Sequence, residues 1–328
     1  MTEWTIPTLD DVKAARDRIA PYLPRTPQYH YSSLDVLTGA QTWVKHENHL
    51  PTGAFKVRGG VNLMANMTPE DRVRPVIAAS TGNHGQSIAF AANLFGIAAI
   101  ICVPEDANPV KLAAMRESGA EIVMHGADFD DAREHCQKLA EQNGYRYVHS
   151  GDEPDLIAGV GTYALETLEA VSDIDAFIVP IGGGSGAAGT AITAKAVRPE
   201  IQVIGVQSSA APAAWRSWTE RKLVEDKMGT AAEGLATRTA FELPQLIMRD
   251  LLDDFVLVDE EQLLAANFHM IEKTRNLVEP AGAAALAGAM LPSMRERLAG
   301  AKIALICSGG NITPHQLRSV LDQEFSRL

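Results

Sequence analysis

The sequence predicts an α/β protein with two open parallel-sheet domains separated by a cleft, the smaller domain being inserted in the larger one. Short apolar runs alternate with longer Ala-rich helical stretches, which is the order of elements in βαβ units. The apolar runs lack the polar alternation of half-exposed strands, as expected where helices cover both faces of a parallel sheet. At 328 residues, the chain is long enough for two domains.

The predicted elements follow one another in a regular order. Strands are expected at 42–47, 75–80, 98–104, 121–126, 145–150, 176–182, 202–207, 255–260 and 302–308. Helices are expected at 82–96, 109–119, 128–144, 185–197, 261–275 and 314–328. Gly119 and Gly144 stand where a glycine commonly ends a helix.

The domain boundaries follow from this order. Residues 75–150 hold four strands and three helices, and we expect them to form the small mobile domain. Residues 1–74 and 151–328 then form the large domain, which carries most of the ligand-binding turns. Ligands of open α/β sheets bind at the carboxyl ends of the strands, so the cleft between the domains is the expected site.

Composition excludes several classes of protein. The chain has 29 Lys and Arg against 41 Asp and Glu, a formal charge of −12, which disfavours nucleic acid and anionic membranes as partners. Three cysteines without a C-x-x-C pair indicate a reducing compartment, so we expect a cytoplasmic protein. The longest uncharged apolar run, 88–103, is shorter than the ~20 residues of a membrane-spanning helix and predicts a buried helix followed by a buried strand.

A glycine-rich turn at 182–186 lies between a predicted strand and a predicted helix. Its backbone N–H groups can converge on a phosphate at the helix N-terminus. The overlapping segment 184–189 also has the G-x-G-x-x-G pattern of dinucleotide folds, which leaves a nicotinamide-dependent oxidoreductase as an alternative. That site needs an acidic residue at the tip of the next strand, where this chain has Gln207, so the alternative ranks lower.

Two further features indicate a carboxylated substrate and a reactive amine. The turn at 80–85 offers hydroxyls and N–H groups to a carboxylate, although Ser, Thr and Asn there are also good helix caps. Lys56 follows a turn in apolar and glycine-rich company. A desolvated lysine forms Schiff bases, and an aldehyde cofactor with a phosphate group is pyridoxal 5'-phosphate.

With these residues in view, the chain resembles the pyridoxal-phosphate enzymes of fold type II, the tryptophan-synthase β type, and within them the serine/threonine dehydratase and serine racemase branch. The resemblance covers essentially the whole chain. It rests on five motifs in the family's order: ENHLPTGAFKVRGG (47–60), STGNHGQSIAFAA (80–92), VPIGGGSGAAG (179–189), LVEPAGAAAL (277–286) and CSGGN (307–311).

The resemblance implies a role for each site residue. Lys56 would form the Schiff base and act as the catalytic base, with Thr81 and Ser80 as further catalytic candidates. Binding of the substrate carboxylate would fall to Ser80, Thr81, Gly82, Asn83 and His84. Binding of the cofactor would fall to Phe55, Lys56, Asn83 (at the 3-hydroxyl), Gly182, Gly183, Gly184, Ser185 and Gly186 (at the phosphate), Ser308 (at the pyridine nitrogen), Gly234 and Glu279.

The expected function is therefore the α,β-elimination of a 3-hydroxy amino acid, such as L-threonine or L-serine, to a 2-oxo acid and ammonia. Alternatives are a serine or hydroxyaspartate racemase and a dehydratase of a bulkier 3-hydroxy amino acid. Racemisation ranks below elimination because Thr81 replaces the serine of the racemases. Gln207, Ala211 and Ala213 replace the acidic ligands of metal-dependent members, so we expect no divalent metal site of that type. Members of this family are commonly dimers or tetramers, so the resemblance implies a homodimer or tetramer.

Overall fold

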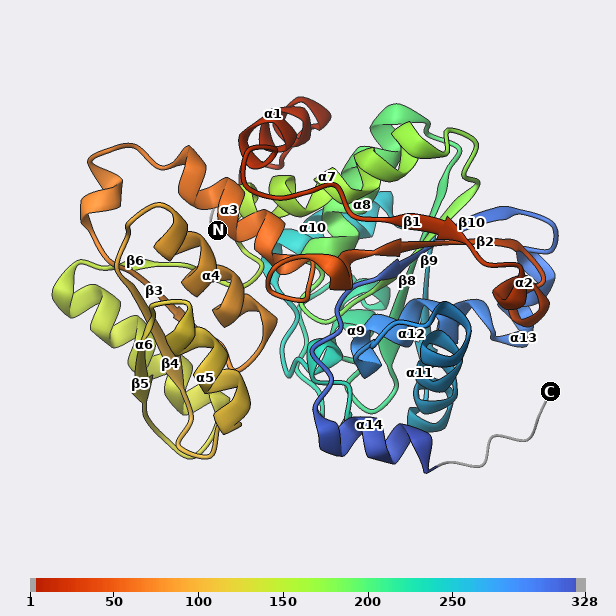
Figure 1. The fold of residues 1–328 in the computed structure, drawn as a ribbon. Coiled ribbons are helices and arrows are strands. Elements are labelled where there is room, and N and C mark those ends of the chain that lie inside the picture. The colour runs from red at the N-terminus through yellow and green to blue at the C-terminus, as the bar shows by residue number, and fades with distance from the viewer. Residues whose placement is uncertain (1–3, 323–328) are drawn as a thin grey trace.

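The computed structural model describes residues 4–322, and within that range the strands form two separate sheets (Figure 1). The larger, six-stranded sheet has the order β1-β2-β10-β7-β8-β9. Its strands are β1 (Gln28–His30), β2 (Gln41–His46), β7 (Ala176–Pro180), β8 (Gln202–Ser208), β9 (Asp254–Val258) and β10 (Lys302–Cys307). The smaller sheet has the order β5-β4-β3-β6, with β3 (Val76–Ala79), β4 (Ala99–Val103), β5 (Glu121–Met124) and β6 (Arg146–Tyr147). The predicted α/β class with two sheets is confirmed.

Among the described strands, all neighbours pair in parallel except β1, which runs antiparallel to β2 with Tyr29 opposite Val44. Strand β1 is not among the strands expected from the sequence. Its three residues, Gln-Tyr-His, are partly or fully exposed at the edge of the sheet and carry no apolar run. The last strand of the described residues, β10, lies between β2 and β7, so segments from early and late in the sequence pair inside one sheet.

The smaller lobe, by which we mean residues 76–147 around the smaller sheet, buries this sheet between helices on both faces, and the larger lobe is the part of the described chain around the larger sheet. Val76 and Ala78 of β3 pack toward α4 (Asn83–Leu94) and α5 (Pro109–Glu117), whereas Ile77 and Ala79 pack toward α6 (Phe129–Asn143). Alternate residues of one strand therefore face opposite layers of helices. Gly144 ends α6 in the left-handed conformation, with φ +68°, as its sequence position suggests.

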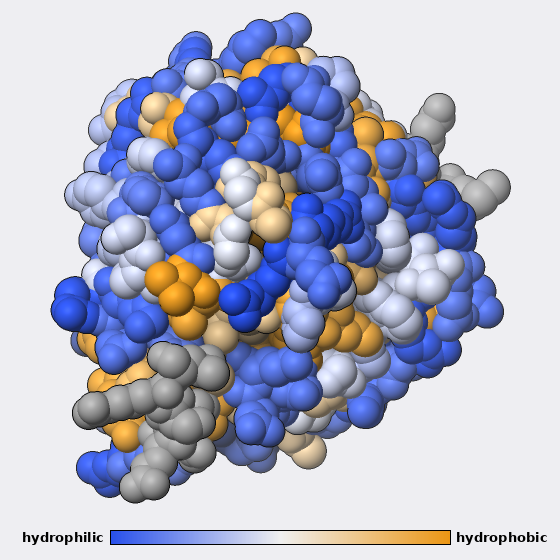
Figure 2. Space-filling model, turned by 90° about the vertical axis from the view of Figure 1, so that its right-hand side faces the viewer, coloured by the Kyte–Doolittle hydropathy of each residue, from blue (hydrophilic) through white to orange (hydrophobic). Residues whose placement is uncertain are grey.

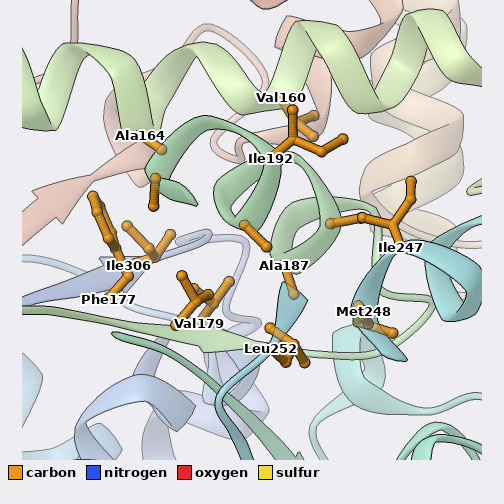
Figure 3. Packing of buried hydrophobic residues seen from close by; sticks show 14 of the residues in the cluster. Val160, Ala164, Phe177, Val179, Ala187, Ile192, Ile247, Met248, Leu252 and Ile306 are labelled. Carbon is orange, nitrogen blue, oxygen red and sulfur yellow. The ribbon is translucent and has the colours of Figure 1, made fainter. Parts of the chain in front are cut away.

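The larger lobe has the same three layers. Phe177, Val179 and Ile306 point toward α7 (Pro154–Ala170), α8 (Ser185–Val197) and α10 (Glu242–Leu251), as Figure 3 shows. The opposite face, including Ile178 and Leu305, packs on α11 (Glu260–Thr274) and α12 (Pro280–Ala289). Helix α3 (Lys56–Asn66) packs against α4 of the smaller lobe and α7 of the larger one, and so connects the two.

The remaining elements surround these layers. They are α1 (Leu9–Ile19), α2 (Ser32–Thr38), α9 (Ala213–Thr219), α13 (Pro292–Arg297), α14 (Pro314–Leu321) and the short 3₁₀ turns η1 (Glu47–His49), η2 (Asp71–Val73) and η3 (Glu233–Leu235). The helix predicted at 314–328 corresponds to α14, and its last positions, 323–328, lie outside the described residues. No helix in the described part of the chain is long and apolar enough to cross a membrane. Hydrophilic residues cover most of the face of the large lobe in Figure 2, and hydrophobic residues lie there in small groups.

Candidate active site

A cavity of about 440 Å³ lies between the two sheets. Its wall includes residues that follow three strands: Ser80 after β3, the turn 182–186 after β7 and Ser308 after β10. These are carboxyl ends of parallel strands, where open α/β sheets bind their ligands. The structure brings every site residue predicted from the sequence to this one cavity: Phe55, Lys56, Ser80, Thr81, Gly82, Asn83, His84, Gly182, Gly183, Gly184, Ser185, Gly186, Gly234, Glu279 and Ser308.

Lys56 is the first residue of α3, and its amine points into the cavity. The Phe55 N–H donates to the carbonyl of Ser308 at 3.0 Å, which ties the start of the helix to the end of β10. Lys56 Nζ donates to Ser150 O at 3.0 Å and to Ser185 Oγ at 2.9 Å. Burial lowers the pKa of Lys56 to about 8, and no carboxylate in the part of the chain that the structure describes pairs with the amine to oppose this effect. A neutral amine is therefore accessible near physiological pH.

The backbone of residues 182–186 forms a turn at the start of α8 that can surround an anion, and we call this turn the cradle. Gly184 has φ +94°, a left-handed conformation that favours glycine. A Cβ on Gly182 would lie 2.3 Å from the carbonyl of Gly234, and one on Gly183 would lie 2.0 Å from the Phe241 ring, so neither position accepts a side chain as built. Helix α8 begins at Ser185 without a side-chain cap, which leaves its first N–H groups for an anion.

The turn 80–84 has a second set of donors. Helix α4 begins at Asn83 behind Gly82, and among the described residues no side chain caps it. The alternative that Ser, Thr or Asn of this turn serves as the N-cap is therefore wrong. Ser80 Oγ instead accepts the Gly82 N–H at 3.2 Å. The N–H groups at the start of α4 stay free to bind a carboxylate.

Asn83, Glu279 and Asn311 form a chain of hydrogen bonds beside the cavity. Asn311 Nδ2 donates to Asn83 Oδ1 at 2.7 Å, and Asn83 Nδ2 donates to Glu279 Oε1 at 2.8 Å. Burial raises the pKa of Glu279, against the opposing effect of the Asn83 hydrogen bond. Sequence reasoning named the CSGGN motif but gave Asn311 no role, and the motif itself was the signal that could have found it.

Two histidines near Lys56 are neutral. Burial, reinforced by the charge of Lys56, lowers the pKa of His84 to about 3 and that of His149 to about 4. His149 Nδ1 accepts the N–H groups of Gly151 and Asp152, at 3.3 and 2.8 Å. At neutral pH, neither ring adds positive charge to the cavity.

Charged residues of both lobes meet at the cavity wall, and sequence reasoning missed them. Lys111 of α5 pairs with Glu233 of η3. Asp130 of α6 accepts from Arg133 at 3.0 Å and lies 3.3 Å from Arg238 Nε. One carboxylate is thus shared by two guanidinium groups, which leaves a net positive charge at this end of the cavity. No local pattern marks the pairs Lys111–Glu233 and Arg238–Asp130, because their partners lie on different lobes.

Behind the cavity, Arg58 lies in a buried cluster of charges. Its guanidinium is fully buried and makes paired hydrogen bonds of 2.6–3.0 Å with the carboxylates of Glu47 and Glu166. Lys45 Nζ also donates to Glu166, at 2.6 Å. Burial by itself would lower the pKa of Arg58, but the two carboxylates outweigh it and hold the pKa above its usual value. The cluster joins β2, η1, α3 and α7, and so fixes the helix that begins with Lys56.

Gln207 stands at the end of β8, where a dinucleotide fold would need a carboxylate. Its Oε1 accepts the backbone N–H of Trp215 at 2.9 Å, which holds the start of α9. Across residues 4–322, no group of three His, Cys, Asp or Glu side chains has a geometry that could hold a metal ion.

Comparison with known proteins agrees with this geometry. The family model described as pyridoxal-phosphate dependent enzyme matches residues 19–309. The chain is 35% identical over 318 residues to the L-threonine ammonia-lyase of Thermotoga maritima, covering 96% of this chain and 78% of that protein. It is 36% identical over 308 residues to the L-threo-3-hydroxyaspartate ammonia-lyase of Saccharomyces cerevisiae, covering 94% of each. The structure of maize serine racemase superposes with a TM-score of 0.92 at 32% identity, covering 97% of each chain.

Proposed function

This chain belongs to the family of pyridoxal-phosphate dependent enzymes, and on that premise we propose how its residues carry out the α,β-elimination of a 3-hydroxy amino acid. It is an ammonia-lyase of the branch that contains the threonine ammonia-lyases, and its products are a 2-oxo acid and ammonia. Because the chain belongs to this family, we set aside the alternative of a nicotinamide-dependent oxidoreductase. The observation that carries the residue roles is the position of Lys56 Nζ between the backbone cradle of α8 and the uncapped start of α4.

The residues of the cavity fit the cofactor. The cradle 182–186 has the free N–H groups that a phosphate needs, and Gly182 and Gly183 let its backbone lie against Gly234 and Phe241, where a side chain would clash. Lys56 has an amine with lowered pKa beside that cradle. Phe55, Asn83, Gly234, Glu279 and Ser308 supply the rest of the wall. Pyridoxal phosphate, when bound, would link covalently to an amine and withdraw electrons from the bonds at Cα.

We assign proton transfer to Lys56. Its neutral amine takes the Cα proton, the electrons of that bond form the Cα–Cβ double bond, and the bond from Cβ to the hydroxyl oxygen breaks. The same ammonium then protonates the departing hydroxide, so that water leaves. The enamine product hydrolyses in water to the 2-oxo acid and ammonia. His84 and His149 are buried and neutral, so neither ring places a second positive charge beside Lys56.

Substrate orientation falls to the turn 80–84. The free N–H groups of α4 and the hydroxyls of Ser80 and Thr81 hold the α-carboxylate, with Asn83 and His84 completing that wall. Racemisation would require a proton donor on the opposite face of Cα, for which Thr81 is the candidate. Its β-branched side chain has restricted rotation, which favours elimination.

The first experiment compares the wild type with Lys56→Ala. The wild type is expected to bind pyridoxal phosphate with an absorbance band near ~410 nm and to release 2-oxo acid from L-serine or L-threonine. Lys56→Ala should lose the band and about 10³-fold or more in rate. Lys13→Ala, at a surface lysine paired with Asp10, is the matched control and should behave as wild type. The proposal would be contradicted by a wild type that stays colourless after pyridoxal phosphate is added. It would also be contradicted by formation of D-serine without 2-oxo acid.

A second substrate is favoured by the charges at the cavity wall. Arg133 and Arg238 share Asp130, and the resulting positive charge suits the second carboxylate of a 3-hydroxyaspartate, the substrate named for the yeast relative. Arg238→Gln should lower kcat/KM for L-threo-3-hydroxyaspartate about tenfold and leave the value for L-serine unchanged. Arg221→Gln, on an exposed arginine, is the control. Equal loss on both substrates would exclude this role.

Assembly, location and domain motion complete the proposal. We propose a homodimer or tetramer, because Tyr29 is exposed on the edge strand β1, and light scattering tests this assembly.

We propose a cytoplasmic location, because the three cysteines of the described chain are buried and form no disulfide. We propose that 75–150 moves as a unit relative to 1–74 and 151–328. The ion pairs of Lys111 and Asp130 with the large lobe would then break on opening.

A further inference from the structure

Asn311 ends the CSGGN turn and does not line the cavity, yet its side chain contacts a residue that does. Both protons of its amide nitrogen are used. One goes to the carbonyl oxygen of Thr52 at 2.8 Å and the other to Asn83 Oδ1 at 2.7 Å. These contacts join positions 228 and 259 residues apart in sequence.

The carbonyl of Thr52 decides how the two amides are oriented. A carbonyl can only accept, so Asn311 must turn its NH₂ group toward Thr52. That same NH₂ group then faces Asn83, which must present its oxygen in return. Asn83 consequently turns its own NH₂ group toward the carboxylate of Glu279, 2.8 Å away. A flipped Asn83 would set NH₂ against NH₂ and oxygen against carboxylate, and would lose both bonds.

The fixed orientation leaves Asn83 with one spare donor. Its NH₂ group has two protons, and Glu279 takes one. Asn83 lines the cavity, so the second proton is available to a ligand there. Glu279 is buried and its backbone N–H donates to the carbonyl of Gly309 at 3.2 Å, so the acceptor end of the chain is held by the same turn that bears Asn311.

We propose that Asn311 is a positioning residue that fixes the Asn83 amide so that an N–H, and not the carbonyl, faces the 3-oxygen of the cofactor. This inference rests on the proposed function and on the position of Asn83 at the 3-oxygen of the cofactor, which the family resemblance implies. A donor at that oxygen favours its ionised form, and therefore the longer-wavelength band of the bound cofactor. Loss of Asn311 lets the amide turn and removes that preference.

The test uses the full-length protein with Asn311→Asp, which cannot donate to Asn83. We expect affinity of the apoprotein for pyridoxal phosphate to fall about tenfold and part of the absorbance to move to shorter wavelength. The expected change in kcat exceeds that in KM for L-serine. Asn48→Asp is the matched control, since this neighbouring loop asparagine bonds Leu277 O and the Cys307 thiol but not Asn83. It should leave the spectrum unchanged.

A double variant separates positioning from other effects. In an Asn83→Ala background, Asn311→Asp should change neither the spectrum nor the cofactor affinity further, because its effect passes through Asn83. An additional loss in that background, or an unchanged spectrum in Asn311→Asp alone, would overturn the inference. Asn311→Ser, which can donate only once, is measured beside it in case the aspartate prevents folding, and an unchanged spectrum there overturns the inference equally. A wild type without any cofactor band would instead contradict the proposed function.

Discussion

Lys56 and Arg58 lie two residues apart on the first turn of one helix, and their surroundings are opposite. Arg58 is enclosed by the carboxylates of Glu47 and Glu166, which raise its pKa against the effect of burial. Among the described residues, the Lys56 amine has no carboxylate partner: it donates to a hydroxyl and a carbonyl oxygen and lies over the Phe55 ring, and burial lowers its pKa to about 8. The helix thus carries one cation that is permanently charged and holds structure, and one amine that can lose its proton and react.

The comparison shows that burial alone does not decide charge. Neighbouring carboxylates keep a buried cation ionised, and their absence favours the neutral form. A reactive lysine must keep carboxylates away, whereas the helix that presents it needs a rigid anchor. Here the anchor's carboxylates come from η1 and α7, on the side of α3 away from the cavity.

The largest effect is expected from removing the anchor. Arg58→Met leaves two buried carboxylates without their main partner, and we expect the free energy of unfolding to fall by about 3–5 kcal/mol. Chemical denaturation of the apoprotein measures this change. A loss below about 1 kcal/mol would show that the cluster contributes little and would remove one half of the comparison.

A smaller effect is expected at the second cation of the cluster. Lys45→Met removes one hydrogen bond to Glu166, whose oxygens keep both contacts with Arg58. We expect a loss of about 1–3 kcal/mol in the same denaturation experiment. If Lys45→Met were as harmful as Arg58→Met, the cluster would depend on total charge more than on the paired geometry of the guanidinium.

The pH dependence of stability tests the neutral residues around Lys56. The pKa of His149 is about 4 in the folded chain against 6.5 for an ordinary histidine, so unfolding takes up a proton between these values. Stability should therefore fall as the pH drops from about 6.5 toward 4. His149→Asn keeps an acceptor for the Gly151 and Asp152 N–H groups but cannot titrate. Its melting temperature should fall less than that of the wild type between pH 7 and pH 5, and an equal fall would count against this assignment.

The smallest effect on the free energy of unfolding is expected at Lys56. Lys56→Met removes a buried amine that no carboxylate compensates, and it keeps most of the side-chain volume. The free energy of unfolding of the apoprotein should change by less than about 0.5 kcal/mol, or rise. The same denaturation experiment, run beside Arg58→Met, tests this. A loss at Lys56→Met as large as that at Arg58→Met would show that both cations of this helical turn are needed for stability.

Much of this arrangement could be predicted from the sequence, because strongly apolar runs and glycine-rich turns are local signals. The strand runs ending near Ser80, Pro180 and Cys307 mark where the site residues follow. By contrast, β1 has no apolar run, and it is placed by its antiparallel pairing with β2. The orientation of Asn83 depends on Thr52 and Asn311, and the second guanidinium at Asp130 comes from Arg238 of the larger lobe. Such long-range pairings leave no local pattern.

The position of β10 inside the large sheet has a consequence for biosynthesis. Strands β2 and β7 are translated long before β10, which is the last strand and inserts between them. Until the ribosome has released residues 302–307, both inner edges lack their partner and could pair with other chains. The smaller sheet, whose strands all lie within residues 76–147, can close much earlier. A nascent chain stalled before β10 would therefore combine a finished small lobe with an open large sheet, the species most in need of a chaperone.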